Sequence, residues 1–215
     1  MNNFAKKYKI IIYEREGDTM ENILFINSCI RAEDISRTYR ICKAFLDRYT
    51  QLHDETTVTE IVLTKSNLTS LTQNDIEQRD AAILTKEYDN PIFDYAKQFA
   101  NADKIIIGAP LWDLSFPSIL KVYIEHICVN TVTFMYENGM PVGLSNFSKL
   151  MYISTSGGFV GEKYFGTEYV EGIAKFLGSG EFLSLNVQGL DIEGMDVETL
   201  MSSAAAKAVQ FAEEF

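Results

Sequence analysis

The sequence predicts an α/β protein with one open, mostly parallel, five-stranded β-sheet and helices on both faces. Two observations carry this prediction. Apolar runs of strand length alternate with longer segments whose apolar residues have helical spacing. The run KIIIGAP, residues 104–110, is almost entirely apolar and ends in glycine and proline, which is typical of a strand buried on both faces of a parallel sheet. Five such strands suggest a three-layer sandwich with the strand order 2-1-3-4-5.

The first half of the chain contains two strands and three helices by pattern. The run NILFIN, 22–27, has strand length, and 34–50 carries apolar residues spaced by three and four, as on one face of a helix. The β-branched run TTVTEIVLTK, 56–65, predicts a second strand. A short helix is expected around 74–84, and Pro91 starts another, because proline suits the first helical position.

The second half contains a hairpin as well as the alternating elements. Asn138-Gly139 is a strong turn signal and predicts a β-hairpin over 131–144, inserted before the fourth core strand. The other elements follow the same patterns as before: strand 104–110, helix 118–129, strand 149–158, helix 162–178, strand 181–190 and helix 197–215.

The chain length of 215 residues suits one domain, which we expect over 21–215. Residues 1–20 are then an N-terminal extension. Met20 directly precedes the first strand, and codons for Glu16-Gly17-Asp18 can contain a ribosome-binding sequence, so we hypothesise that 1–19 is mostly a translated leader. The alternative is that KIIIYER in this extension forms an extra strand on a sheet edge.

Composition excludes several classes of protein. The formal net charge of −11 disfavours nucleic acid and anionic membranes as partners, because both need a basic surface. The three cysteines are odd in number and lack metal-ligand spacing, which indicates reduced thiols in a cytoplasmic protein and no metal site. No apolar run approaches the roughly 20 residues of a membrane span.

The segment after the first strand has the residues of an anion site. Ligands of open α/β sheets bind at the carboxyl ends of the strands. Ser36-Arg37-Thr38 stands at a predicted helix start, where unpaired N–H groups and the helix dipole favour a phosphate. Ser36 and Thr38 add hydroxyl donors, and Arg31 or Arg37 can add charge. The alternative is that Ser36 is only an N-cap. Neither GxxxxGK[ST] nor GxGxxG is present here.

Two further loops follow strands three and four. After strand three, the single tryptophan, Trp112, stands with a leucine and a phenylalanine and forms an apolar shelf for an aromatic ring system. The alternative is ordinary core packing. After strand four, Gly157 and Gly158 allow close approach of a ligand to the backbone, although a simple loop would also use them. All three signals fall on one edge of the predicted sheet, which favours one shared site.

The most specific resemblance to a known family lies in 108–144, GAPLWDLSFPSILKVYIEHICVNTVTFMYENGMPVGL. This stretch resembles the flavin loop, the Pro-x-x-Leu-Lys helix and the Thr-Phe hairpin of the FMN-dependent NAD(P)H oxidoreductases of the azoreductase and quinone-reductase family, which have a flavodoxin-like fold. The similarity extends over nearly the whole chain from about Met20 onward. It implies that FMN is the cofactor and that NADH or NADPH is the electron donor.

The resemblance also implies residue roles in three groups. One group surrounds the FMN phosphate, two loops hold the flavin ring, and one aromatic lines the substrate pocket. The residues that the resemblance places around the phosphate are Ser28, Cys29, Ser36, Arg37 and Thr38, and the residues themselves suggest Arg31 as an added charge. The two ring loops are Pro110, Leu111, Trp112, Asp113 and Leu114, and Thr155, Ser156, Gly157 and Gly158; the aromatic is Tyr136. The flavin carries the chemistry, so no catalytic side chain is assigned.

Three residues depart from the family pattern. Asp113 replaces the usual asparagine, Ser156 a common arginine, and Val160 a histidine that some members have. A carboxylate at Asp113 would disfavour the anionic reduced flavin. The preference for NADH or NADPH stays open.

The implied reaction is ping-pong hydride transfer to a small acceptor such as a quinone, an azo compound or a nitroaromatic. The resemblance further implies a homodimer in which the partner completes each site, with the 131–144 hairpin at the interface edge. Two alternatives stay open: a flavodoxin-like one-electron carrier, and a flavin-free binding module on the same fold.

Overall fold

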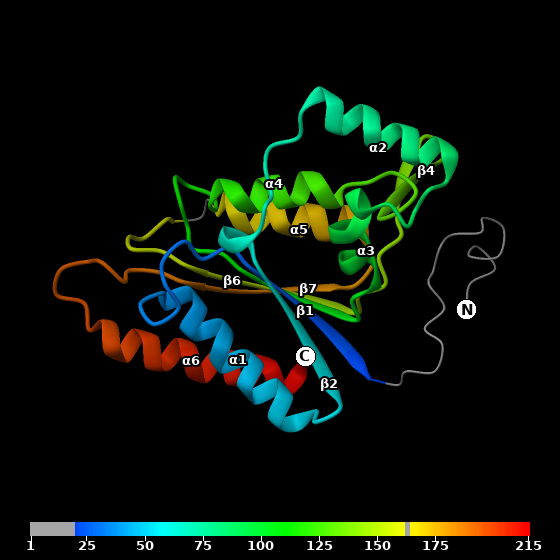
Figure 1. Cartoon of the computed structure of the whole chain (residues 1–215). Helices are drawn as coiled ribbons and strands as arrows, with labels where there is room; N and C mark the ends of the chain where they lie inside the picture. Colours follow the sequence, from blue (N-terminus) through cyan, green and yellow to red (C-terminus); the bar gives the residue numbers. More distant parts are fainter. Residues whose placement is uncertain (1–19, 162–163) are drawn as a thin grey trace.

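The computed structural model describes residues 20–161 and 164–215 (Figure 1). Residues 1–19 lie outside this range, so the translated leader and the extra edge strand both stay predictions. The described part is layered, with a central sheet between two groups of helices (Figure 1).

The central sheet has five parallel strands in the order β2-β1-β3-β6-β7. Along the chain, the five core strands are β1, β2, β3, β6 and β7, so β6 and β7 are the fourth and fifth core strands. The predicted order 2-1-3-4-5 is therefore confirmed. Strands β4 and β5 pair antiparallel as the predicted hairpin before the fourth core strand. The strands are β1 (Glu21–Asn27), β2 (Thr56–Val62), β3 (Lys104–Gly108), β4 (Phe134–Glu137), β5 (Met140–Gly143), β6 (Lys149–Thr155) and β7 (Glu181–Val187).

The helices divide between the two faces of the sheet. In Figure 1, α1 and α6 lie below the sheet, α3, α4 and α5 lie above it, and α2 lies farther out at the top. The α-helices are α1 (Arg37–Leu52), α2 (Gln73–Thr85), α3 (Asp94–Asn101), α4 (Ser118–Ile127), α5 (Phe165–Leu177) and α6 (Val197–Glu214); two 3-10 turns are η1 (Leu63–Lys65) and η2 (Pro91–Phe93).

Apolar side chains on both faces of β3 explain the two helical layers. Ile106 packs in the cluster shared with α1 and α6, whereas Ile105 and Ile107 pack in the cluster shared with α3, α4 and α5. Every β3 residue after Lys104 is buried, as its continuous apolar run predicts. The sheet therefore has no solvent-facing side at its centre, and its strand ends are the places where a ligand can reach it.

The β4–β5 hairpin has the turn that its sequence predicts. Asn138 and Gly139 both have left-handed backbones, with φ of 51° and 80°, as a two-residue hairpin turn with the right strand twist requires. Phe134 anchors the hairpin on α5, its ring centroid 4.6 Å from that of Phe176. Tyr136 and Met140 stay exposed on the other side.

Some element boundaries differ from the prediction. Helix α1 begins at Arg37 and not at 34, because a turn closed on the Ala32 carbonyl precedes it and Ser36 caps it. Strand β2 ends at Val62 and not at 65, because Leu63–Lys65 turns as a 3-10 helix and buries Leu63. Local side-chain burial and capping override the β-branched pattern there.

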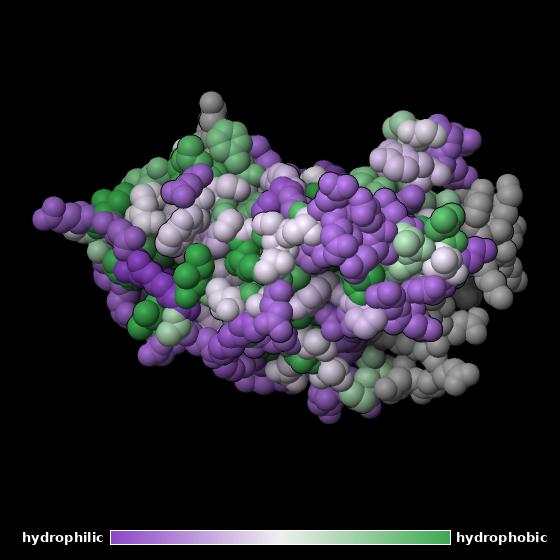
Figure 2. All heavy atoms as spheres, turned by 45° about the horizontal axis from the view of Figure 1, so that its top comes forward, coloured by the Kyte–Doolittle hydropathy of each residue, from purple (hydrophilic) through white to green (hydrophobic). Residues whose placement is uncertain are grey.

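The surface shown in Figure 2 mixes hydrophilic and hydrophobic side chains, with hydrophobic residues in small separate groups. No helix in 20–161 or 164–215 is long and apolar enough to cross a membrane. Within the same ranges, no group of three or more His, Cys, Asp or Glu side chains is placed to hold a metal ion.

Buried tyrosines make the fold sensitive to alkaline pH. Burial raises the pKa of Tyr49, Tyr123 and Tyr152 above the ordinary value of about 10. Above about pH 10 the unfolded chain releases these protons while the folded chain keeps them, so the stability that they contribute is full below that pH and is lost as the pH rises. We expect the urea midpoint to be steady near neutral pH and to fall steeply above about pH 10.

The Tyr123→Phe variant isolates one of these groups. The Tyr123 hydroxyl is buried and has no hydrogen-bond partner among the described residues. Its removal should change the free energy of unfolding at pH 7 by less than about 1 kcal/mol and should reduce the alkaline loss. Urea unfolding at pH 7 and pH 10.5 measures both; an alkaline loss equal to that of the wild-type protein would contradict the explanation.

Candidate functional site

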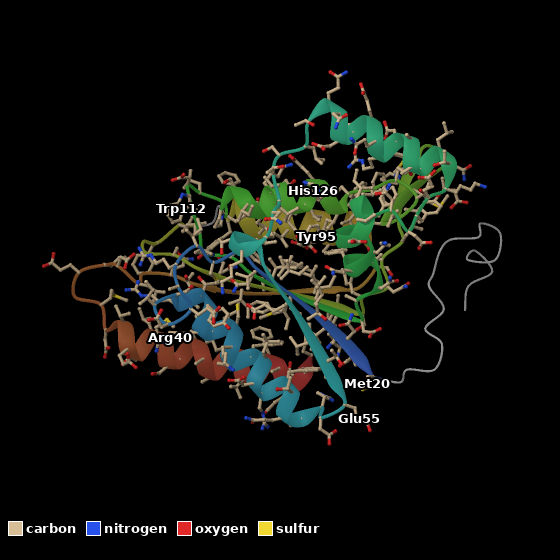
Figure 3. All side chains as sticks on the ribbon, viewed as in Figure 1. Met20, Arg40, Glu55, Tyr95, Trp112 and His126 are labelled. Atoms are coloured by element: carbon tan, nitrogen blue, oxygen red, sulfur yellow. The ribbon has the colours of Figure 1, made fainter. Side chains whose placement is uncertain are left out.

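Three loops meet in one cavity of about 200 Å³ at the carboxyl ends of β1, β3 and β6. In Figure 3, Trp112 of this region lies at the opposite end of the molecule from Met20 and Glu55, which precede β1 and β2. The cavity is lined by Ile30, Arg31, Ile35, Ser36, Arg37, Thr38, Pro110, Leu111, Trp112, Thr155, Ser156, Gly157, Leu190 and Asp191.

The start of α1 forms one wall. Ser36 caps this 16-residue helix, and its hydroxyl oxygen accepts from the Tyr39 N–H at 3.3 Å. The capping interpretation of Ser36 is therefore right, yet the residue also lines the cavity. Arg37 and Thr38, the first two helical residues, have N–H groups that no helical carbonyl can accept. Arg31 lines the same wall and forms no ion pair with a described residue. This wall suits an anion.

Thr155 connects this wall to the other two loops. Its hydroxyl lies 2.6 Å from the hydroxyl of Thr38, and both side chains are buried. Its carbonyl accepts from the Leu111 N–H at 2.8 Å, so the segment after β3 continues alongside the end of β6. The N–H of the next residue, Ser156, donates to the Val187 carbonyl at 2.8 Å. These bonds fix the relative positions of all three loops.

An ion pair crosses the cavity. A guanidinium nitrogen of Arg37 lies 2.7 Å from a carboxylate oxygen of Asp191, a residue of the loop between β7 and α6. The Asp191 N–H donates to the Gly157 carbonyl at 2.9 Å. A Cβ on Gly157 would lie 2.3 Å from the Asp191 carboxylate, so any other residue there would require the Asp191 side chain to move. Asp191 was not among the predicted site residues, since nothing in its local sequence marks it.

The segment after β3 forms a tight turn at the rim. Trp112 and Ser115 exchange two backbone hydrogen bonds of 3.2 and 2.9 Å. The two residues between them, Asp113 and Leu114, have left-handed backbones with φ of 49° and 67°. Trp112 is 47% exposed and Leu114 is 61% exposed, so this part of the predicted shelf is open to solvent, whereas its phenylalanine, Phe116, packs in the core.

Ser28 and Cys29 lie behind the cavity and do not line it. The hydroxyl and the N–H of Ser28 both donate to the Gly108 carbonyl, each at 2.9 Å. The Cys29 N–H donates to the Asn27 side chain at 3.0 Å. Burial raises the pKa of the Cys29 thiol to about 11. At neutral pH this thiol is protonated, so Ser28 and Cys29 support the loop and are not reactive groups.

Four other predicted residues do not line the cavity. Asp113 and Leu114 stand at the tip of the rim turn, and a Cβ on Gly158 would meet nothing within 4 Å, which leaves open space beside the loop. Tyr136 was expected in the substrate pocket, but it lies on β4, at the far end of the molecule from Trp112 (Figures 1 and 3). The hairpin packs on α5 and carries Tyr136 away from the cavity of its own chain.

A larger hollow of about 500 Å³ lies near the amino end of the sheet, between β1, β2 and α3. Amide side chains and the Asp94–Lys97 ion pair line it. It contains the acidic first turn of α3, which disfavours an anion. The smaller cavity has the better chemistry for a phosphate, since it has a helix start with an arginine and no acidic residue in that turn.

Comparisons with known proteins match most of the chain. A family model described as "Flavodoxin-like fold" matches residues 21–212. An FMN-dependent NADH:quinone oxidoreductase of Clostridium perfringens is 35% identical over 91% of this chain and 100% of its own length. A protein of the same name from Lachnoclostridium phytofermentans is 36% identical with the same coverage.

Solved structures have the same fold. An azoreductase from Bacillus anthracis superposes with a TM-score of 0.82 at 25% identity, over 91% of this chain and 100% of that chain. An FMN-dependent NADH-azoreductase from the same species, solved in complex with FMN, superposes with a TM-score of 0.78 at 20% identity, over 91% and 99% of the two chains.

The ion pair predicts how the cavity responds to an anion. Asp191 neutralises Arg37, so an incoming anion must compete with this carboxylate. We expect Asp191→Asn to bind inorganic phosphate about fivefold more tightly than the wild-type protein, because a partly exposed pair contributes on the order of 1 kcal/mol. Titration calorimetry with phosphate measures the difference.

Glu193→Gln is the matched control. Glu193 belongs to the same loop and carries the same charge, but it forms no ion pair with a described residue. Its substitution tests the general effect of removing one negative charge. Equal phosphate affinity in the two variants would contradict competition for Arg37.

Proposed function

This chain belongs to the flavodoxin-like family that includes FMN-dependent NADH:quinone oxidoreductases and azoreductases, and on this premise we propose that it transfers electrons from NADH or NADPH, through bound FMN, to small acceptors such as quinones and azo compounds. One observation carries the proposal. Loops after three strands meet in a cavity that has a helix start and two arginines on one wall and an exposed tryptophan at its rim. A phosphate attached to an aromatic ring system matches both features.

The phosphate of FMN would bind at the α1 start. The N–H groups of Arg37 and Thr38 and the hydroxyl of Ser36, all in residues that line the cavity, would serve as donors, and Arg31 would add positive charge. Ser28 and Cys29 would act from behind by holding the loop against β3. Arg37 would exchange Asp191 for the phosphate.

The flavin ring would lie at the rim. A cavity of about 200 Å³ is smaller than the roughly 300–1,000 Å³ of a typical cofactor site, so it takes the phosphate and the ribityl chain and leaves the ring against Trp112 and Leu114. The open space beside Gly158 gives the ring room on the opposite side. Asp113, at the tip of the turn, would place a carboxylate near the polar edge of the ring.

The protein binds and orients the reactants and need not supply an acid or a base. FMN, when bound, supplies the two-electron hydride chemistry between donor and acceptor. The Asp191 carboxylate is paired with Arg37, and burial raises the pKa of the Cys29 thiol to about 11. The described lining residues include no histidine, lysine, glutamate or tyrosine.

We also propose that the protein is a cytoplasmic homodimer. Tyr136, Met140 and Val142 are exposed on the hairpin and point to a contact with a second chain, which would bring a second aromatic side chain to a site that already has Trp112. All three cysteines are unpaired, which supports a reducing compartment.

Spectroscopy tests the proposed activity. The purified protein with added FMN should show flavin absorbance that stays with the protein on gel filtration, and FMN should quench the fluorescence of Trp112, the single tryptophan. NADH or NADPH added under nitrogen should bleach the flavin band, and a quinone should restore it. A bound flavin that neither nucleotide bleaches would overturn the enzymatic proposal.

The same experiment separates the two alternatives. A long-lived semiquinone during stepwise reduction would favour a one-electron carrier. Unchanged tryptophan fluorescence and an unchanged melting temperature with FMN would favour a flavin-free module.

The homodimer gives a second prediction. Light scattering after gel filtration should give twice the chain mass of 24.3 kDa. Tyr136→Glu combined with Met140→Glu should shift the protein toward monomer, because two charges would then have to be desolvated in the contact. Leu52→Glu, on an exposed residue at the end of α1, is the control and should leave the mass unchanged. A wild-type monomer at working concentration would refute the dimer.

A further inference from the structure

Two hydroxyls lie unpartnered inside the protein on one face of β6. Tyr152 and Ser154 are each 1% exposed, and neither hydroxyl has a hydrogen-bond partner among the described residues. They point to the same side of the sheet, because alternate residues of a strand share a face. A buried hydroxyl without a partner costs about 1–3 kcal/mol, so two such groups on one short stretch call for a physical explanation.

The start of α5 lies against the same place. The Tyr152 hydroxyl lies 3.2 Å from the point where a Cβ on Gly166 would stand, and Gly166 is the second residue of this 13-residue helix. Tyr164, at the cap position, makes no side-chain capping bond. The Tyr164 side chain therefore does not satisfy the first N–H groups of α5, and the Tyr152 hydroxyl lies close to this first turn.

A third hydroxyl belongs to the same region. The Tyr164 hydroxyl oxygen is buried and unpartnered. The pKa of Tyr152 is raised mainly by burial, lowered by the Ser154 hydroxyl and raised by Tyr164. These side chains are therefore close enough to influence one another, although none of their hydroxyls meets the geometry of a hydrogen bond.

We propose that Tyr152, Ser154 and the start of α5 form a binding site for ordered water. A buried water commonly makes about three hydrogen bonds to polar groups that otherwise lack partners. Tyr152 and Ser154 supply two of these bonds, and an N–H group in the first turn of α5 supplies the third. A neutral water fits better than an anion, because no charged side chain is among these groups and an unpaired buried charge is costly.

The water site would support two parts of the cavity, the rim turn after β3 and the loop after β6. A Cβ on Gly166 would stand 3.2 Å from the Ser115 carbonyl oxygen as well as from the Tyr152 hydroxyl, so the first turn of α5 contacts the rim turn directly. Ser156, two residues after Ser154, lines the cavity. Water held between β6 and α5 thus joins the end of β6 to the helix that contacts the Trp112–Ser115 turn.

A high-resolution crystal structure of the wild-type protein tests the site directly. We expect one water within hydrogen-bond distance of both the Tyr152 and Ser154 hydroxyl oxygens, and within reach of an α5 N–H group. A direct hydrogen bond between the two hydroxyls with no water beside them would overturn the proposal, and so would an adventitious ion only. Neither readout depends on FMN or NADH, so the test is independent of the proposed function.

Variants give a second, thermodynamic test. Tyr152→Phe and Ser154→Ala should each lower Tm by several degrees, because each removes one of the bonds that hold the water. The double variant should lose no more than the larger single loss, since the water is already released. Tyr123→Phe, which removes a buried unpartnered hydroxyl from α4, is the control and should leave Tm unchanged or raise it. Fully additive losses, or unchanged Tm in both single variants, would contradict a shared water.

Discussion

The candidate site depends on Thr155, the last residue of β6. Its hydroxyl pairs with Thr38 at the start of α1, and its carbonyl accepts from Leu111 of the segment after β3. Both bonds form where Thr155 is only 7% exposed, so water competes weakly for them. Loops that are more than forty residues apart in sequence are therefore held at one strand end. The anion wall and the apolar rim keep a fixed separation, which a ligand with a phosphate at one end and a ring at the other requires.

An anion in the cavity would have to bind against the electrostatic field of the whole protein. A net charge of −11 repels anions at long range, but such repulsion is screened beyond about 8–10 Å at physiological salt. Affinity must then come from short contacts: the N–H groups at the start of α1, the Ser36 hydroxyl and the two arginines. Asp191 gives Arg37 a partner when no ligand is bound. This arrangement keeps Arg37 near the cavity and makes binding an exchange of one anion for another.

The sequence was sufficient to predict the architecture and the three loops that line the cavity. The apolar run of β3 and the Asn138-Gly139 turn have strong local signals, and the structure has both features as predicted. Asp191 was missed because its role depends on Arg37, 154 residues away, and no local pattern encodes that contact. The boundary of β2 was wrong because tertiary burial of Leu63 outweighs β-propensity. Tyr136 was placed by resemblance alone. Its hairpin packs on α5 and lies away from the cavity of its own chain, so the role of Tyr136 stays a prediction that depends on a second chain.

The rim turn shows where local preference and fold disagree. Leu114 and Asp113 adopt left-handed backbones, which cost an L-residue roughly 1–2 kcal/mol each. Glycine would avoid this cost. The turn is nevertheless held by the paired Trp112 and Ser115 bonds and by the contact of α5 with Ser115. Strain of this kind persists only where the surroundings determine the conformation fully. Here the result is that Trp112 and Leu114 stay exposed on a hydrogen-bonded turn instead of packing into the core. An apolar surface that is already formed binds a planar ring without first having to be ordered.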